Sequence, residues 1–125
     1  MTRSTVLGLY AATVAALAVG CAETKTLTPP PSRQILNGGA IALQAYGCGS
    51  CHRIPSIASA DGIVGPPLVD MRRRVYIGRG LPNTPSNMAR WIQLPQKFAP
   101  GSVMPDMQVS GADAQAITAF LWHSD

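Results

Sequence analysis

The stretch Cys48-Gly49-Ser50-Cys51-His52 is the part of this chain around which the rest is organised. Two thiols three positions apart, followed directly by a histidine, form the pattern that attaches a c-type haem. The two intervening residues let both sulfurs reach neighbouring vinyl groups of one porphyrin, and the adjacent imidazole can then bind the iron as its proximal ligand. The sequence therefore predicts one covalent haem c per chain, attached through Cys48 and Cys51 and ligated by His52.

Other interpretations of this motif are a thioredoxin-like redox pair, half of a zinc site, or chance. A zinc site needs about four ligands, and only Cys21 and His123 remain to complete one. A redox dithiol would follow a strand in a βαβ pattern, which the neighbouring sequence does not show. The haem interpretation is therefore favoured over the other three.

The length and composition limit what else the chain can be. Its 125 residues are enough for one domain plus a segment that is removed or serves as a tether. The three cysteines each have a proposed role, so no disulfide framework is expected. The formal net charge of +4 is small and scattered. It does not indicate nucleic-acid binding, and it suits a protein partner with an acidic docking patch.

Residues 1–21 are expected to be a signal peptide that ends in a lipobox. Arg3 provides the positive charge, residues 6–20 are apolar and uncharged, and the segment closes with LAVGC at Cys21. Cleavage before Cys21 would leave a lipidated cysteine, and several acyl chains give firm membrane attachment. An ordinary cleaved signal peptide and an uncleaved anchor remain as alternatives. All three interpretations export the domain, which agrees with the attachment of c-type haem after export.

Residues 22–32 are expected to be a linker, with the folded domain following over residues 33–125. The three consecutive prolines of this segment favour an extended polyproline II conformation. Such a spacer is semi-rigid and would hold the domain away from a membrane surface.

The order of motifs after the linker is similar to that of class I cytochromes c. It runs from a helix through CxxCH, Gly-Pro-x-Leu, a tryptophan-bearing helix and a Met-Pro segment to a terminal helix. More narrowly, VGPPL, GLPNTPSNMARWIQLPQ and PGSVMPDM resemble the cytochrome c domain fused to subunit II of some haem-copper oxidases. The chain shows neither the binuclear copper motif nor the paired transmembrane helices of that subunit. We therefore expect the electron-carrying module alone.

The resemblance implies an all-α fold, the class I cytochrome c fold, with three main helices and loops wrapped around one haem. Ser32 can cap a first helix over residues 33–46, and Thr84-Pro85 can start a second that ends before Pro95. Ser110 begins a capping-box-like start to the third. The resemblance further implies that Phe120 of this last helix crosses the first helix at Gly39.

The second axial ligand is expected to be Met104. Of the four methionines that follow the haem motif, Met71 lies too near the Gly-Pro segment and Met88 occupies an inward helix position. Met104 follows PGSV and precedes a proline, which matches the family's P-G-x-x-M, while Met107 is the competitor. Imidazole and thioether together raise the iron's potential relative to two nitrogen ligands, and they fill both axial positions. Electron transfer is therefore expected, and haem catalysis is not.

Five further residues are expected near the cofactor because of the resemblance. The carbonyl of Pro66 would accept a hydrogen bond from the proximal imidazole, Leu68 would pack on the haem, and Trp91 would stack near its edge. Ser102 would place a hydroxyl near the inner propionate, and Arg74 is the arginine chosen to meet a propionate. The alternatives are structural roles: a rigid turn at Pro66, core positions for Leu68 and Trp91, and a solvated arginine loop.

These expectations describe a carrier of single electrons in a respiratory chain, and not an enzyme. It would be exported to the periplasmic or extracytoplasmic side and tethered to the membrane through lipid on Cys21. Its partners would be redox proteins: a haem-copper terminal oxidase, a dehydrogenase or another cytochrome, with Arg53, Arg79 and Lys97 guiding docking. One alternative is a permanent cytochrome c subunit of an oxidase or dehydrogenase complex. Another is a haem-free thiol- or metal-binding lipoprotein.

Overall fold

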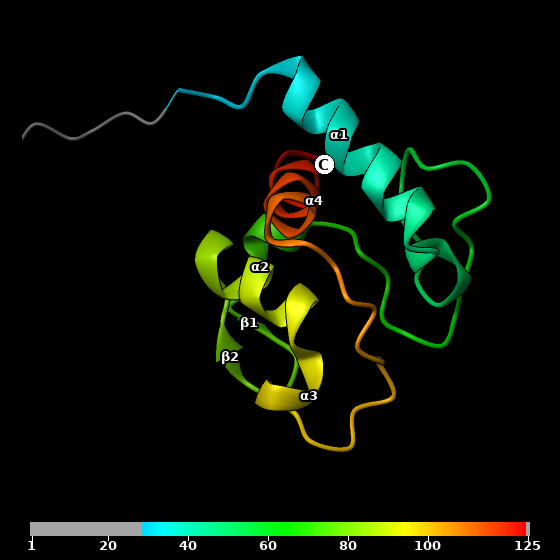
Figure 1. Ribbon diagram of the computed structural model, residues 1–125, viewed down its shortest axis with the longest axis vertical. Helices are drawn as coiled ribbons and strands as arrows, with labels where there is room; N and C mark the ends of the chain where they lie inside the picture. The colour runs from blue at the N-terminus through cyan, green and yellow to red at the C-terminus, as the bar shows by residue number, and fades with distance from the viewer. Residues whose placement is uncertain (1–28, 125) are drawn as a thin grey trace, which may run out of the picture.

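Helix α1 begins where the proline-rich segment ends, in a computed structural model that describes residues 29–124 (Figure 1). Ser32 is the N-cap, and its hydroxyl accepts a hydrogen bond from a backbone N–H of the first turn at 3.4 Å. The helix spans Arg33–Ala45 and is capped by Tyr46. Gly47 follows with φ of +66°, the left-handed conformation that commonly ends a helix. The first expected helix is thus present to within one residue.

The other two main helices also begin at the expected caps. Helix α2 spans Pro85–Gln93, with Thr84 as N-cap and proline at the first helical position. Helix α4 spans Gly111–His123, and the Ser110 hydroxyl accepts a hydrogen bond from the N–H of the third helical residue at 3.1 Å. Local capping chemistry therefore sets where both helices start.

Shorter elements lie between these helices, and the sequence did not lead us to expect them. They are the 3-10 turns η1 (Cys48–Ser50) and η2 (Met71–Arg73), the strands β1 (Tyr76–Ile77) and β2 (Leu81–Pro82), and the helix α3 (Pro95–Phe98). The two strands pair antiparallel through a turn that contains two glycines with positive φ. The described part of the chain is thus mostly helical, with a small two-stranded sheet added to the expected helices.

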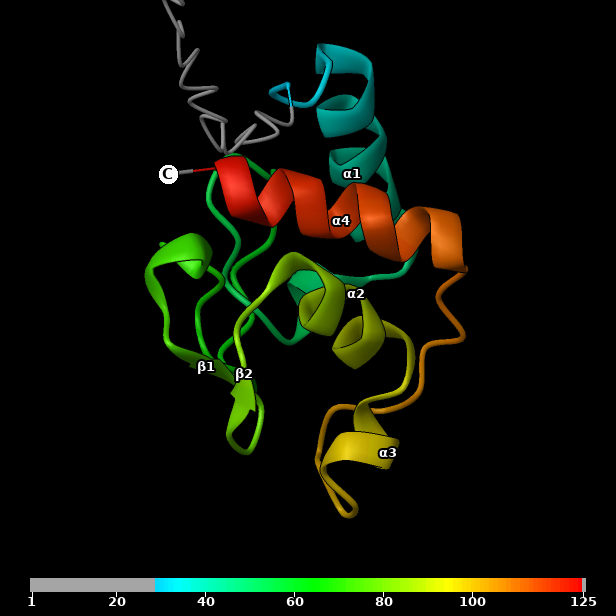
Figure 2. The same cartoon turned by 90° about the vertical axis from the view of Figure 1, so that its left-hand side faces the viewer.

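The core forms where α4 crosses α1 on one side and α2 on the other (Figure 2). A Cβ placed on Gly39 of α1 would lie 2.6 Å from the Cβ of Phe120 on α4, so only glycine permits this approach. Leu43 and Ile117 are each 1% exposed beside the crossing. The contact that the resemblance implied between Gly39 and Phe120 is therefore present.

A hydrogen-bond cluster joins the end of α1 to the start of α4. The Tyr46 hydroxyl donates to the carboxylate of Asp113 at 2.9 Å and accepts from the backbone N–H of Ser110 at 3.3 Å. The Ser110 hydroxyl donates to the same carboxylate oxygen at 2.7 Å. These bonds, from Ser110 first and Tyr46 second, hold the pKa of Asp113 below its ordinary value. The cluster ties two elements that are distant in sequence.

The expected signal peptide over residues 1–21, including Cys21, and residues 22–28 of the linker lie outside the described residues. Ser32, at the linker's end, has an extended backbone with φ of −63° and ψ of 153°. Within residues 29–124, none of the helices is both long enough and apolar enough to cross a membrane.

The adjacent glycines of α1 are expected to respond in opposite ways to alanine. Gly39→Ala should lower the free energy of unfolding by about 1–3 kcal/mol, because the new methyl group overpacks the crossing. Gly38→Ala places its methyl group 4.0 Å from the Cβ of Ala116, an ordinary contact, and should gain about 0.5–1 kcal/mol from the helix interior. Thermal unfolding of both variants tests this; an equal effect at both positions would contradict the close crossing.

Tyr46→Phe is expected to produce a stability loss that depends on pH. Because the pKa of Asp113 is lower in the folded protein than in the unfolded chain, the carboxylate stabilises the fold above about pH 3.9. That contribution disappears as the pH falls through the folded-state pKa. Removing the Tyr46 hydroxyl should raise this pKa, so the variant should be less stable near pH 6 and approach the wild type in acid.

Unfolding midpoints between about pH 2 and pH 7, together with NMR titration of the Asp113 carboxyl, measure this effect. Tyr76→Phe is the matched control, since it removes a hydroxyl from an exposed tyrosine in β1. A gap between wild type and Tyr46→Phe that does not narrow in acid would show that the carboxylate is not responsible.

Candidate functional site

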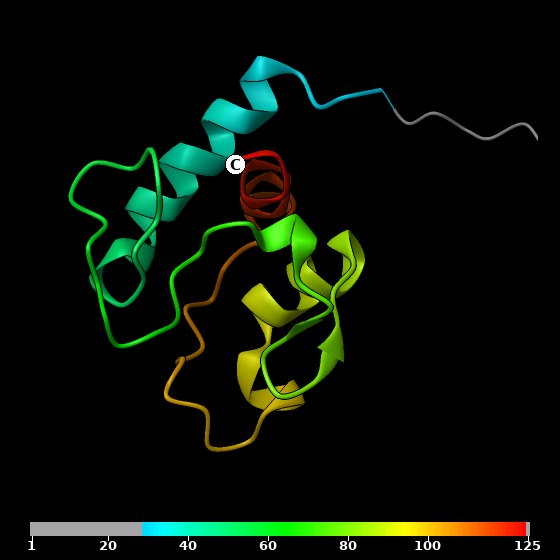
Figure 3. The same cartoon turned by 180° about the vertical axis from the view of Figure 1, so that it is seen from behind.

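A cavity of about 440 Å³ is lined by residues of the Cys48–His52 motif, of the α2 helix and of the loop that precedes α4. Figure 3 shows the ribbon of these segments from behind. This volume falls within the range of about 300–1,000 Å³ that is typical of ligand and cofactor sites. The residues expected to bind the cofactor all lie on its wall: Cys48, Cys51, His52, Pro66, Leu68, Arg74, Trp91, Ser102 and Met104. The fold thus brings together residues that are as many as 56 positions apart, from 48 to 104.

The imidazole of His52 is fixed by a backbone carbonyl. Its Nδ1 lies 2.7 Å from the carbonyl oxygen of Pro66. A carbonyl only accepts, so Nδ1 donates this hydrogen bond, and in the neutral imidazole Nε2 then keeps its lone pair for a metal. A hydrogen bond of this kind orients a ligating imidazole and raises its basicity. The expected Pro66 contact is present in the structure.

Glycines bring the loop after the motif into direct contact with it. A Cβ on Gly65 would lie 2.6 Å from Nδ1 and 2.8 Å from Nε2 of His52, so this glycine packs against the ring. A Cβ on Gly62 would lie 2.6 Å from the backbone nitrogens of Cys51 and His52. The N–H of Gly65 donates to the carbonyl of Cys51 at 2.8 Å. In the sequence, Gly65 is visible only as part of the Gly-Pro-x-Leu motif, which does not indicate this packing.

The two thiols are half-buried and unpaired in the structure. Burial raises the pKa of the Cys48 thiol, and the neighbouring Cys51 adds to this effect, while a backbone hydrogen bond opposes it. Reactive CxxC pairs instead have a thiol whose pKa is lowered by a helix N-terminus or by cations. The raised pKa of Cys48 is opposite in direction to the shift found in such pairs.

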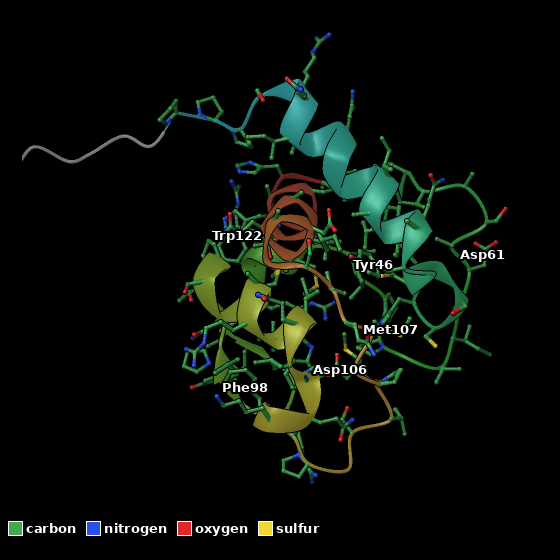
Figure 4. The ribbon with its side chains drawn as sticks, viewed as in Figure 1. Tyr46, Asp61, Phe98, Asp106, Met107 and Trp122 are labelled. Carbon is green, nitrogen blue, oxygen red and sulfur yellow. The ribbon has the colours of Figure 1, made fainter. Side chains whose placement is uncertain are left out.

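The four methionines that follow the motif all line the cavity, and they differ in burial. Met71 and Met88 are core residues, 5% and 2% exposed respectively. Met104 is half-buried, whereas Met107 is 40% exposed. Figure 4 labels Met107 on the loop that precedes α4. The other histidine, His123, lies in the last turn of α4 and is exposed.

The loop that carries Met104 is held by polar side chains. The hydroxyl of Ser102 accepts a hydrogen bond from the N–H of Met104 at 3.2 Å, so it braces the loop from within. Gln96 of α3 also bonds to this loop. Gln96 was not among the expected site residues, since no local signal marks a glutamine that bonds to a residue eight positions along the chain.

Arg74 and Asn83 stabilise the segment between the Gly-Pro motif and the hairpin through hydrogen bonds to its backbone. The Nη2 atom of Arg74 donates to the backbone carbonyls of Pro67 and Val69, the latter at 3.1 Å. The amide nitrogen of Asn83 donates to the carbonyls of Met71 and Arg74, at 2.6 and 2.9 Å. Arg74 thus has a bracing role in addition to its place on the cavity wall, while its contact with a propionate stays a prediction.

Trp91 and Leu68 are half-buried on the wall of the cavity and pack against the core. A Cβ on Gly78 would lie 2.6 Å from the Cη2 atom of Trp91, so the turn of the hairpin lies directly on the indole ring. The hairpin therefore sets the position of the tryptophan. Its contact with a haem edge stays a prediction.

Comparisons with protein-family models, with curated proteins and with solved structures found no match to this chain. Among residues 29–124, no group of three or more histidine, cysteine, aspartate or glutamate side chains could hold a metal ion. The chemistry of the site is therefore inferred from its own residues and geometry.

Gly65→Ala is expected to displace the imidazole of His52. The new methyl group would occupy the space of the ring, and such overpacking costs about 1–3 kcal/mol of unfolding free energy. The His52 Nδ1 proton should also lose its carbonyl partner and exchange faster in NMR spectra. Gly111→Ala is the control, because its methyl group would meet only the Gln93 amide at 3.7 Å. Equal stability and an unchanged imidazole signal in both variants would contradict this packing.

Proposed function

We propose that this chain is a monohaem class I cytochrome c, an exported and membrane-tethered carrier of single electrons in a respiratory chain. One observation carries the proposal: the Cys48 and Cys51 thiols line the same cavity as Met104 and as His52, whose Nδ1 is engaged by the Pro66 carbonyl. Covalent attachment and two axial ligands need these groups around one apolar space.

The residues of the site fit a haem c. Cys48 and Cys51 would hold it through thioether bonds, and the Nε2 atom of His52 has a lone pair available because Nδ1 carries the proton. Met104 would supply a thioether from the loop before α4. When bound, the haem provides an iron that alternates between ferrous and ferric states, gaining or losing one electron.

The role of carrier follows from the number and kind of ligands. The His52 imidazole and the Met104 thioether would both ligate the iron, which would leave no ligand position for oxygen or a substrate. The buried methionines Met71 and Met88, with Ile117, keep the inner wall of the cavity apolar. A hydrophobic surrounding of this kind limits the access of water and tunes the redox potential.

The rim of the cavity is suited to brief contact with a redox partner. Val64 and Val103 line the cavity and are 66% and 80% exposed. Arg79 lies at the same rim, and Arg53 and Lys97 are exposed elsewhere on the described surface. An apolar contact with a positive charge beside it suits an acidic partner, whose approach such a charge accelerates. A haem-copper oxidase is the partner that we propose, with tethering through lipid on Cys21.

The haem assignment is tested on the exported full chain by a haem stain after denaturing electrophoresis and by visible absorbance. The wild type should keep its haem through denaturation and give a low-spin c-type spectrum. Double replacement of Cys48 and Cys51 by serine should abolish covalent haem. Met104→Leu should keep the haem and open the iron to added ligands such as imidazole, whereas Met107→Leu should behave as wild type. A wild type without covalent haem would refute the proposal.

The direction of electron flow is tested with membranes from the protein's own source. The reduced protein should be oxidised rapidly by these membranes, and cyanide should stop the oxidation. A protein that stays reduced would instead support a subunit of a dehydrogenase complex. Co-purification with a large complex would support a permanent subunit over a mobile carrier.

A further inference from the structure

A single side chain, Gln96, bonds to three backbone groups of the loop that carries Met104. Its Nε2 donates to the carbonyl oxygens of Ser102 and Met104, both at 2.7 Å. Its Oε1 accepts from the N–H of Gly101 at 3.1 Å. Both hydrogens of the amide and its oxygen are therefore used, and all of them on this one loop.

The loop needs an external anchor because it has no regular hydrogen-bond ladder. Residues 99–110 contain neither helix nor strand, and Gly101 takes a φ of +78°. Val103, next to Met104, is 80% exposed, so little apolar packing holds this part of the loop. The part-buried carbonyls of Ser102 and Met104 instead have the Gln96 amide as their donor, and a buried backbone group without a partner is costly.

Gln96 is itself attached to a rigid part of the fold. It follows Pro95, the fully buried first residue of α3, and Ala99, immediately after α3, is 0% exposed. The loop leaves α3 directly and leads to α4 (Figure 1). The amide of Gln96 thus bonds the backbone of Met104, eight residues along the chain, to α3, which the buried Pro95 and Ala99 hold in place.

We propose that Gln96 is a positioning residue that keeps the Met104 thioether in the cavity and so protects the axial bond from competing ligands. This inference rests on the proposed function, since it concerns the ligand that Met104 would provide. Gln96 contacts no reacting atom; it acts through the backbone of Met104. Without Gln96, moving the loop away from the cavity costs less free energy, so an added ligand such as imidazole replaces the Met104 thioether more easily.

The test compares Gln96→Ala and Gln96→Glu with Gln93→Ala in the haem-loaded full chain. Gln93 is the matched control: it is also half-buried, and its Nε2 donates to the carbonyl of Ala89 within its own helix, at 3.0 Å. Glutamate has nearly the size of glutamine, but its carboxylate only accepts, so it cannot donate to the two carbonyls. The Gln96→Glu variant therefore shows the effect of losing hydrogen bonds while the volume of the side chain is nearly unchanged.

Two readouts report on the axial bond and not on activity. The first is a titration of the ferric protein with imidazole, followed by visible absorbance. The second is the ring-current-shifted methyl signal of an iron-bound methionine in the NMR spectrum of the reduced protein, recorded as the pH is raised. We expect both Gln96 variants to keep their covalent haem and to bind imidazole about tenfold or more tightly, because two or more hydrogen bonds are lost. Their methionine signal should also disappear at lower pH than in the wild type.

The wild type and the control make the outcomes distinct. A wild type without haem or without the methionine signal refutes the proposed function before any variant is compared. If the wild type has both the haem and the methionine signal, the inference alone is refuted when Gln96→Ala and Gln96→Glu show the same imidazole affinity and the same methionine signal as the wild type. An effect of the same size in Gln93→Ala also refutes it, because the perturbation would then not depend on the loop contacts.

Discussion

The crossing of α1 and α4 is the contact on which the rest of the structure depends. Gly39 lets the two helix backbones approach closely enough for Phe120 to pack directly on α1. This approach places the end of α1, which leads into the cysteine motif, beside α4, whose Ile117 and Leu121 line the cavity. A larger residue at position 39 would separate the helices and displace two walls of the site together.

The loops around the cavity are held by side-chain donors that bind backbone carbonyls. His52, Arg74, Asn83 and Gln96 each donate to a carbonyl of an irregular segment. These segments form no ladder with one another, so their carbonyls need other partners. For His52 the same bond has a second effect, because it leaves Nε2 free of the proton. Structural support and ligand chemistry thus depend on the same interaction.

Much of the fold follows from local chemistry that is visible along the chain. Ser32, Thr84 and Ser110 cap the three main helices as expected, because a cap depends only on residues within one turn. The hairpin over residues 76–82 could also have been anticipated, since its Gly78-Arg79-Gly80 turn is a common signal for paired strands. The short α3 and the 3-10 turns span only three or four residues, which is too few for a periodic pattern in the sequence to mark them.

The sequence by itself determined which residues the candidate site contains, namely the Cys48, Cys51 and His52 motif and the Met104 segment, and where the main helices lie. These features depend on residue type and on spacing within one or two helical turns. Only the tertiary structure decided how the ligand-bearing loops are held. The packing of Gly65 on His52, the Tyr46 bond to Asp113 and the reach of Gln96 to Met104 join residues across turns and between elements. Such contacts depend on which residues lie close in space, and this is decided by the packing of the helices and loops in the folded chain.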